Sequence, residues 1–226
     1  MSINIVEKID RLVPVRHVLV SVSDKSGLDI FIPELINIVP DIQIISTGGT
    51  FERIKEILKS EQNLVKISKV TGQPETQGGL VKTLDFKIYL GLLTETYNDD
   101  HQKDLERTQA STIDMVVVNL YPFKETVAKE GVTIEQARGN IDIGGPCMIR
   151  ASAKNFLRVA SVVDPSDYGD IIDDIRKNDG STSLETRFKL AQKAFGHTHE
   201  YDANIHKFMN EQLFEDVLSC YRDQAL

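Results

Sequence analysis

The chain of 226 residues is long enough to bury a core without disulfide staples, and its 34 acidic against 26 basic residues give a formal net charge of -8, which argues against a general nucleic-acid-binding protein. It has an ordinary 41% of hydrophobic residues, no signal peptide and no apolar run long enough to span a membrane. Cys147 and Cys220 form no disulfide or metal-binding pattern, so we expect a cytoplasmic protein.

Short β-branched runs alternate along the chain with amphipathic stretches. Strands are expected at residues 17–22, 42–46, 64–68, 115–119 and 159–163, and 87–93 is a further candidate strand of uncertain type. Helices are expected near 26–38 and 50–60, and after Asp164-Pro165 near 166–177, 183–195 and 202–219. This alternation predicts an α/β fold with a parallel sheet covered on both faces up to about residue 165, followed by a helical C-terminal section.

Small and polar residues follow three of these strands, as SDKSG (23–27), STGGT (46–50) and NLYPF (119–123). Ligands of open α/β sheets bind at the carboxyl ends of the strands, so we expect the three segments at one edge. Glycines let a ligand approach the backbone, the N–H groups of the following helix favour an anion, and Lys25 would add positive charge. For STGGT alone, a tight turn with Thr50 as N-cap is an equal alternative. Neither a Walker loop nor a G-x-G-x-x-G fingerprint occurs.

Two later segments also carry candidate residues. In GGLVKTLDFK (78–87), Lys82 and Thr83 follow paired glycines in a loop. In NIDIGGPCMIRASAKN (140–155), Asp142 precedes two glycines, and Pro146 suits the first position of a helix. Arg150 and Lys154 are four positions apart and would lie on one face of that helix, where a lysine is usually just solvated.

The order of motifs resembles a known family. SVSDKSGL, ISTGGT, VTGQPE, VKTL, VVVNLYPF, NIDIGGP, RASAKN, VVDPSDY and KAFGHTHEYD occur as in the inosine monophosphate (IMP) cyclohydrolase domain. That domain is the N-terminal half of the bifunctional purine-biosynthesis protein that also carries the aminoimidazole carboxamide ribonucleotide (AICAR) formyltransferase. The resemblance covers roughly residues 15 to 205 and implies a methylglyoxal-synthase-like, Rossmann-like three-layer domain. We expect this domain over 1–200 and a helical segment over 201–226, where a transformylase domain would begin.

The resemblance implies dehydrative ring closure of formyl-AICAR ribonucleotide to IMP, without a metal or organic cofactor. The family's catalytic residues correspond to Lys82, Tyr121, Asp142 and Lys154. Lys154 and Tyr121 would assist proton transfer at the formyl group, Asp142 would orient or deprotonate the carboxamide nitrogen, and Lys82 would stabilise oxyanion charge. Substrate or its 5'-phosphate would be bound by Ser23, Lys25, Ser46, Thr47, Gly48, Thr50, Thr83, Asn119, Gly144 and Gly145.

The chain departs from the family in one loop, where G-R-V-K-T-L-H-P-K-I-H-G-G is usual. Here Leu80 replaces a cation, Asp85 and Tyr89 replace two histidines, and Phe86 replaces proline. One lost charge-assisted contact would weaken binding or rate by about ten- to a hundredfold. His197, His199 and His206 match a helical segment of the family, so a surface or interface role is expected rather than a metal site.

Three other functions fit the residues less fully. Methylglyoxal synthase shares the fold but has no use for NLYPF or NIDIGGP, and a nucleotide-sensing domain would bind a purine nucleotide without turnover. A purely structural module would not need polar tips on three strands. The resemblance also implies a homodimer without nucleic-acid or membrane partners. Either a separate AICAR formyltransferase or a longer chain containing one would supply the companion activity.

Overall fold

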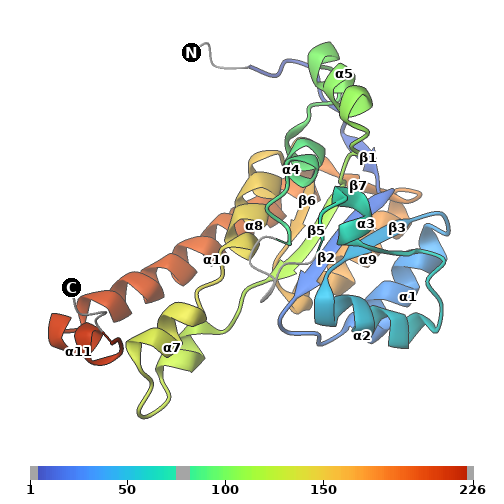
Figure 1. Cartoon of the computed structure of the whole chain (residues 1–226). Helices are drawn as coiled ribbons and strands as arrows, with labels where there is room; N and C mark the ends of the chain where they lie inside the picture. The colour runs from blue at the N-terminus through green and yellow to red at the C-terminus, as the bar shows by residue number, and fades with distance from the viewer. Residues whose placement is uncertain (1–4, 75–81, 223–226) are drawn as a thin grey trace.

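A parallel sheet of five strands forms the centre of the protein, whose computed structural model describes residues 5–74 and 82–222 (Figure 1). The strands are β2 (His17–Val22), β3 (Gln43–Ser46), β4 (Leu64–Lys66), β5 (Met115–Asn119) and β6 (Ala160–Val162). Their order across the sheet is β4-β3-β2-β5-β6, with every neighbouring pair parallel. The chain therefore leaves β2 toward one side for β3 and returns to its other side for β5. This reversal places a topological switch point between β2 and β5.

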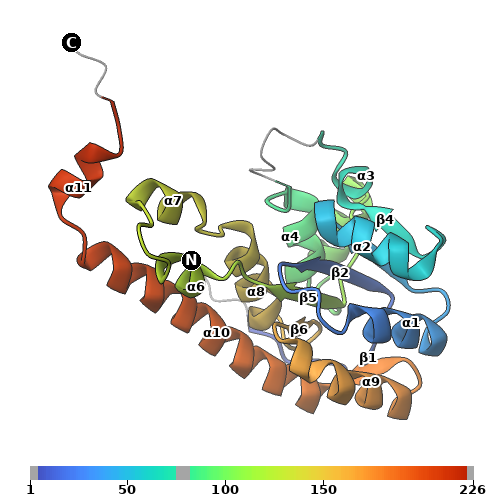
Figure 2. The same cartoon turned by 90° about the horizontal axis from the view of Figure 1, so that it is seen from below.

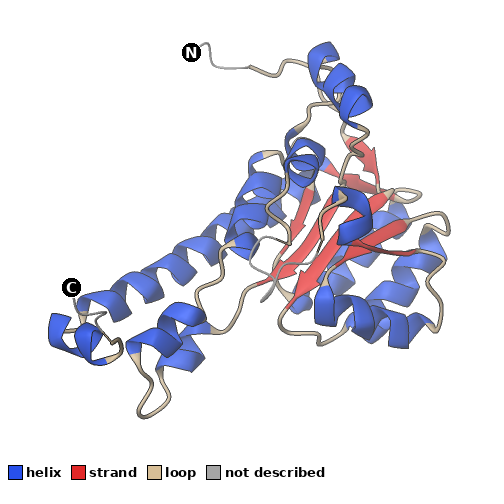
Figure 3. Ribbon diagram, viewed as in Figure 1, coloured by secondary structure: helices blue, strands red, loops and turns tan. Residues whose placement is uncertain are grey.

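Helices cover both faces of the sheet (Figures 1 and 3). Alternate residues of β2 enter different cores, since Val18 and Val20 pack with α1 (Leu28–Ile38), α2 (Gly48–Leu58) and α9 (Tyr168–Lys177). Leu19 packs on the opposite face with α3 (Ile67–Thr71), α4 (Phe86–Leu93), α8 (Gly144–Lys154) and α10 (Leu184–Asn210). The predicted three-layer α/β fold is confirmed.

Shorter elements complete the fold. Strands β1 (Leu12–Pro14) and β7 (Ser181–Ser183) pair antiparallel beside the main sheet. The remaining helices in the described ranges are α5 (Asp99–Thr108), α6 (Phe123–Val127), α7 (Ile134–Gly139), a 3₁₀ turn (Pro165–Asp167) and α11 (Phe214–Ser219). Seen from below, α10 runs along α8 and extends past the sheet toward α11 (Figure 2). No helix in the described part is long and apolar enough to cross a membrane.

Three expected elements differ from the structure. The candidate strand 87–93 is helix α4, because Asp85 accepts a hydrogen bond from the Lys87 N–H at 2.8 Å and Ile88 and Leu92, one turn apart, are both buried. The two helices expected at 183–195 and 202–219 are one continuous α10 followed by α11. Gly196 does not break α10, since Ala194, Thr198 and Tyr201 are buried on either side of it. The predicted domain boundary after residue 200 therefore falls inside a helix.

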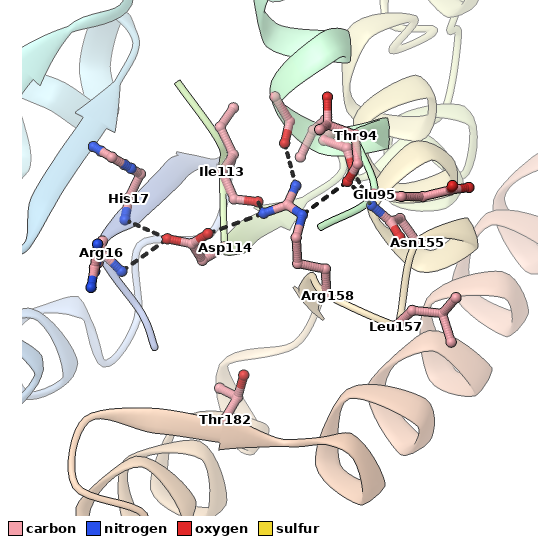
Figure 4. A network of polar contacts seen from close by, with 12 residues as sticks. Arg16, His17, Thr94, Glu95, Ile113, Asp114, Asn155, Leu157, Arg158 and Thr182 are labelled. Carbon is pink, nitrogen blue, oxygen red and sulfur yellow. Dashed lines mark hydrogen bonds and ion pairs between the residues drawn. The ribbon is translucent and has the colours of Figure 1, made fainter. Parts of the chain in front are cut away.

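A buried ion pair holds the amino ends of three strands together (Figure 4). Arg158, just before β6, lies 3.0 Å from Asp114, just before β5, and both side chains are at most 7% exposed. Asp114 also accepts from the N–H groups of Arg16 and His17 at the start of β2, while Arg158 donates to three backbone carbonyls. Both charges are therefore paired and hydrogen-bonded at the amino edge of the sheet, opposite the carboxyl ends of the strands. We assign them a structural role.

Candidate functional site

A cleft of about 470 Å³ lies at the carboxyl ends of β2, β3 and β5. This is the switch point of the sheet, where open α/β folds bind ligands. The cleft brings together all three polar strand tips, the loop around Lys82 and the start of α8. Every site residue expected from the sequence lines it except Ser46 and Lys154.

The first tip is shaped by Asn119 at the end of β5. Its side-chain oxygen accepts from the N–H groups of Ser23 at 2.7 Å and Asp24 at 2.9 Å, and its amide donates to the Asp24 carbonyl at 2.9 Å. Lys25 donates back to the Ser23 carbonyl at 3.3 Å. Asn119 therefore holds the loop that carries Ser23 and Lys25, and most of its hydrogen-bonding capacity is used in doing so.

The hydroxyls of STGGT have different partners. Ser46 is fully buried and donates to the Val20 carbonyl at 2.8 Å, and Thr50 both donates to the Val22 carbonyl and accepts from its N–H at 3.1 Å. Thr50 is not the N-cap that was considered, because α2 begins at Gly48 and its N-cap is Thr47. Ser46 and Thr50 thus attach the turn to β2, and Thr47, Gly48 and Gly49 face the cleft.

An anion would meet positive charge at this turn. Gly48 has φ of 40°, a left-handed value that favours glycine, and a Cβ there would lie 3.3 Å from Lys82 Nζ. The Lys82 ammonium therefore sits against the first turn of α2, whose N–H groups have no partner within the helix. Lys25 lines the same cleft. A helix N-terminus with two lysines suits a phosphate group.

Asp142 lies over the start of α8, where the absence of side chains at two glycines leaves room for Asp142 and for Thr83. Its carboxylate accepts from the Gly145 N–H at 2.9 Å, and a Cβ at Gly145 would lie only 2.6 Å from Asp142 Oδ2. A Cβ at Gly144 would lie 2.6 Å from Thr83 Oγ1. Burial raises the pKa of the Asp142 carboxyl, and hydrogen bonds from the backbone of Gly145 and Tyr121 only partly oppose this.

Helix α8 starts two residues earlier than expected, at Gly144 rather than Pro146. Pro146 is tolerated because N–H groups in the first turn lack intrahelical partners in any case. Lys154 is the last residue of α8 and is exposed, so about 15 Å of helix separates it from the glycine end in the cleft. Tyr121, by contrast, lines the cleft with 55% of its surface exposed.

The residues that depart from the family lie away from the cleft where they are described. Leu80 is outside the described residues. Asp85 caps α4, Phe86 is 58% exposed, and Tyr89 packs against the core beneath α4 with its hydroxyl buried. None of these three lines the cleft. Their change from histidine and proline therefore alters the support of the loop rather than its contacts in the cleft.

The three C-terminal histidines lie along α10. Burial lowers the pKa of His197, and the His206 ring pairs with Asn210 at 3.0 Å. Within the described ranges no group of three histidine, cysteine or acidic side chains is arranged to hold a metal ion.

Comparison with known proteins agrees with the fold. Residues 31–147 match the family described as the MGS-like domain, and residues 152–225 match the family described as the AICARFT/IMPCHase bienzyme. The chain belongs to the MGS-like domain family.

Similar proteins include the bifunctional purine biosynthesis protein PurH of Thermoanaerobacter sp., which is 47% identical over 93% of this chain and 41% of its own length. PurH of Bacillus subtilis is 44% identical over 89% of this chain and 38% of its own. The chain thus spans about two fifths of these relatives. The crystal structure of ForH superposes with a TM-score of 0.76 and 28% identity over 86% of this chain and 97% of its own.

Proposed function

We propose that this MGS-like domain is an IMP cyclohydrolase of purine biosynthesis. The observation that carries the proposal is the cleft itself, in which Lys82, Tyr121 and Asp142 lie around an anion site at the start of α2. The bifunctional purine-biosynthesis proteins similar to this chain support the same activity. The substrate is a nucleotide whose 5'-phosphate lies at Thr47 and Gly48, with Lys25 beside it.

The reaction is an intramolecular condensation. The carboxamide nitrogen of the formylated substrate attacks the formyl carbon and forms a C–N bond, the formyl oxygen takes up a proton, and loss of water leaves the closed ring of IMP. Both reacting groups belong to one molecule, so the cleft acts mainly by folding the substrate and stabilising charge. No added oxidant or reductant is needed.

Five residues of the cleft have a specific role in the proposed reaction. Asp142 accepts a proton from the carboxamide nitrogen, a role for which the raised pKa of its carboxyl brings it closer to neutral pH. Tyr121 donates to the formyl oxygen, and the Lys82 ammonium stabilises the negative charge that develops there. Ser23 and Thr83 supply further hydrogen bonds from the rim.

Lys154 has no place in the cleft of its own chain, since it lies at the far end of α8. Its proposed role in proton transfer therefore requires that a second copy present it to this cleft. That requirement agrees with the homodimer we propose. A cytoplasmic location and a formyltransferase that supplies the substrate, in the same or a separate chain, complete the proposal.

The test is cyclisation of purified formyl-AICAR ribonucleotide, followed by the ultraviolet change as IMP forms. We expect turnover by the wild type and its loss in Lys82→Ala, whereas Lys124→Ala, which removes a lysine outside the cleft, keeps it. A Leu80→Arg variant, which restores the family's cation, is expected to lower KM or raise kcat by about ten- to a hundredfold.

The competing function is a domain that binds a purine nucleotide without turnover, which the altered residues Leu80, Asp85 and Tyr89 favour. It would be established by tight IMP binding with no cyclisation above background in the wild type. Formation of methylglyoxal from a triose phosphate would instead indicate the related lyase. The cyclohydrolase is preferred because Asp142 and Tyr121, which neither alternative requires, line the cleft together.

A further inference from the structure

A tyrosine from the C-terminal helix reaches the loop that carries Asp142. The Asp142 N–H donates to the Tyr201 hydroxyl at 2.7 Å, although the two residues are 59 positions apart in the sequence. Tyr201 is 8% exposed on α10 and does not line the cleft. This contact joins the long helix directly to a residue of the proposed catalytic set.

The ring of Tyr201 also touches the other loop of the site. It packs edge to face on Phe123, the first residue of α6, at 6.2 Å between centroids. Phe123 follows Tyr121 by two positions, and its N–H donates to the Tyr121 carbonyl at 2.8 Å. The backbone of Tyr121 also lies close enough to the Asp142 carboxylate to lower its pKa. One side chain of α10 therefore links the segments that carry Tyr121 and Asp142.

The backbone of Asp142 has little other support at this point. Its carboxylate accepts from the Gly145 N–H, but its own N–H depends on the Tyr201 hydroxyl. Loss of that acceptor would leave a partly buried N–H without a partner, and the loop would shift to find one. Since a shift of about 1 Å in a reacting group is able to cost about a hundredfold in rate, the contact bears on catalysis.

We propose that Tyr201 is a positioning residue for the cyclisation reaction, which holds the Asp142 loop at the geometry that proton transfer requires. This inference rests on the proposed function. It places a functional part of the site in α10, beyond the segment that matches the MGS-like domain.

The test uses two variants of the same helix in the full chain. Tyr201→Phe keeps the ring on Phe123 and removes only the acceptor. Thr198→Val is the matched control, because within the described residues the buried Thr198 hydroxyl bonds only to the carbonyls of Ala194 and Phe195 in its own helix. We expect Tyr201→Phe to lower kcat about tenfold with KM within about twofold of wild type, and Thr198→Val to keep wild-type kcat.

A second readout does not depend on turnover. In amide hydrogen exchange by NMR, the Asp142 N–H should be protected in the wild type and exchange faster in Tyr201→Phe. Wild-type kcat in Tyr201→Phe, equal loss in both variants, or an unprotected Asp142 N–H would overturn the inference while leaving the cyclohydrolase intact. Absence of turnover in the wild type would overturn the proposed function, and the positioning role with it.

Discussion

At the scale of single residues, close approach decides what the cleft is able to hold. Asp142 occupies space that a side chain at residue 145 would fill, and Lys82 reaches the turn at Gly48 for the same reason. The Asp142 carboxyl is partly buried, and this burial raises its pKa. Such a group is useful in proton transfer and unfavourable for folding.

Asp142→Asn is expected to separate these two effects. Cyclisation should fall by about a hundredfold or more, because an amide cannot accept the proton. Folding should suffer little at pH 7, since the variant no longer buries a charge and an asparagine oxygen is able to accept from the Gly145 N–H. The measurements are kcat on formyl-AICAR ribonucleotide and the free energy of unfolding by urea.

The pH dependence of stability checks the same assignment. A carboxyl whose pKa is raised in the folded state binds its proton more tightly there than in the unfolded chain. The wild type should therefore gain stability relative to Asp142→Asn as pH falls through the raised pKa. A relative loss of wild-type stability on acidification would mean that the carboxylate is favourable as an ion, contrary to the assignment.

At the scale of secondary structure, α4 shows how an altered sequence can be accommodated. Asp85 stands where the family has histidine, and its carboxylate accepts from the Lys87 N–H at the start of the helix. An aspartate N-cap satisfies one of the N–H groups that the first turn leaves open. The carboxylate of Asp85 thus stabilises the start of α4, the helix that follows Lys82 and Thr83.

Asp85→Ala should accordingly destabilise the protein by about 1 kcal/mol, the usual cost of losing an N-cap. Asp85→Asn keeps an acceptor and should cost only a few tenths of that amount. Urea unfolding of the two variants measures the difference. A lower KM with unchanged stability in Asp85→Ala would show instead that the carboxylate repels substrate in the cleft.

The elements differ in how far the residues alone predict them. Strands β2 and β5 have the predicted bounds, because each is a β-branched run buried on both faces. The segment KIYLGLL (87–93) could not be assigned from its residues, since a short apolar run fits a helix or a strand. The expected end of a helix near Gly196 was wrong, because packing outweighs the low helix propensity of glycine. Residues at strand ends that line the cleft were predictable, but the use of Ser46, Thr50 and Asn119 within the fold was not. The contact of Tyr201 with Asp142 could not be predicted from any local sequence pattern, because the two residues are 59 positions apart.

At the scale of the whole molecule, the two edges of the sheet have opposite roles. The carboxyl edge holds the cleft, and the amino edge is fixed by Arg158 and Asp114 (Figure 4). Arg158 draws the loops before β5 and β6 and the end of α4 to one point through its hydrogen bonds. Stability of the sheet is thereby concentrated away from the residues proposed to act on substrate.

Arg158→Met should therefore cost about 3–5 kcal/mol of unfolding free energy, since it leaves the buried Asp114 charge uncompensated. Arg176 is the matched control, because it pairs with Glu34 and Asp173 while 52% exposed. Arg176→Met should cost less than about 1 kcal/mol. Equal losses in the two variants, measured by urea unfolding, would contradict a special role for the buried pair.

Assembly of two copies decides whether Lys154 takes part in the reaction. Lys154→Ala and Asp142→Asn are each expected to lose activity, the first although Lys154 lies about 15 Å along α8 from the glycine end of the helix. If a second copy supplies Lys154, a dimer with one subunit of each variant contains one complete cleft and one that lacks both groups. Such a hybrid, purified through two different tags, should have about half the wild-type activity, because a symmetric dimer has two equivalent clefts.

Supply of Lys154 by the second copy or by the same chain predicts different activities for the hybrid. If Lys154 acted within its own chain, each cleft of the hybrid would keep one defect, and activity would stay at the level of the single variants. Wild-type activity in Lys154→Ala would remove the residue from the mechanism altogether. Half activity in the hybrid would show that the cleft of one chain is completed by helix α8 of another, and would make the dimer a requirement of catalysis.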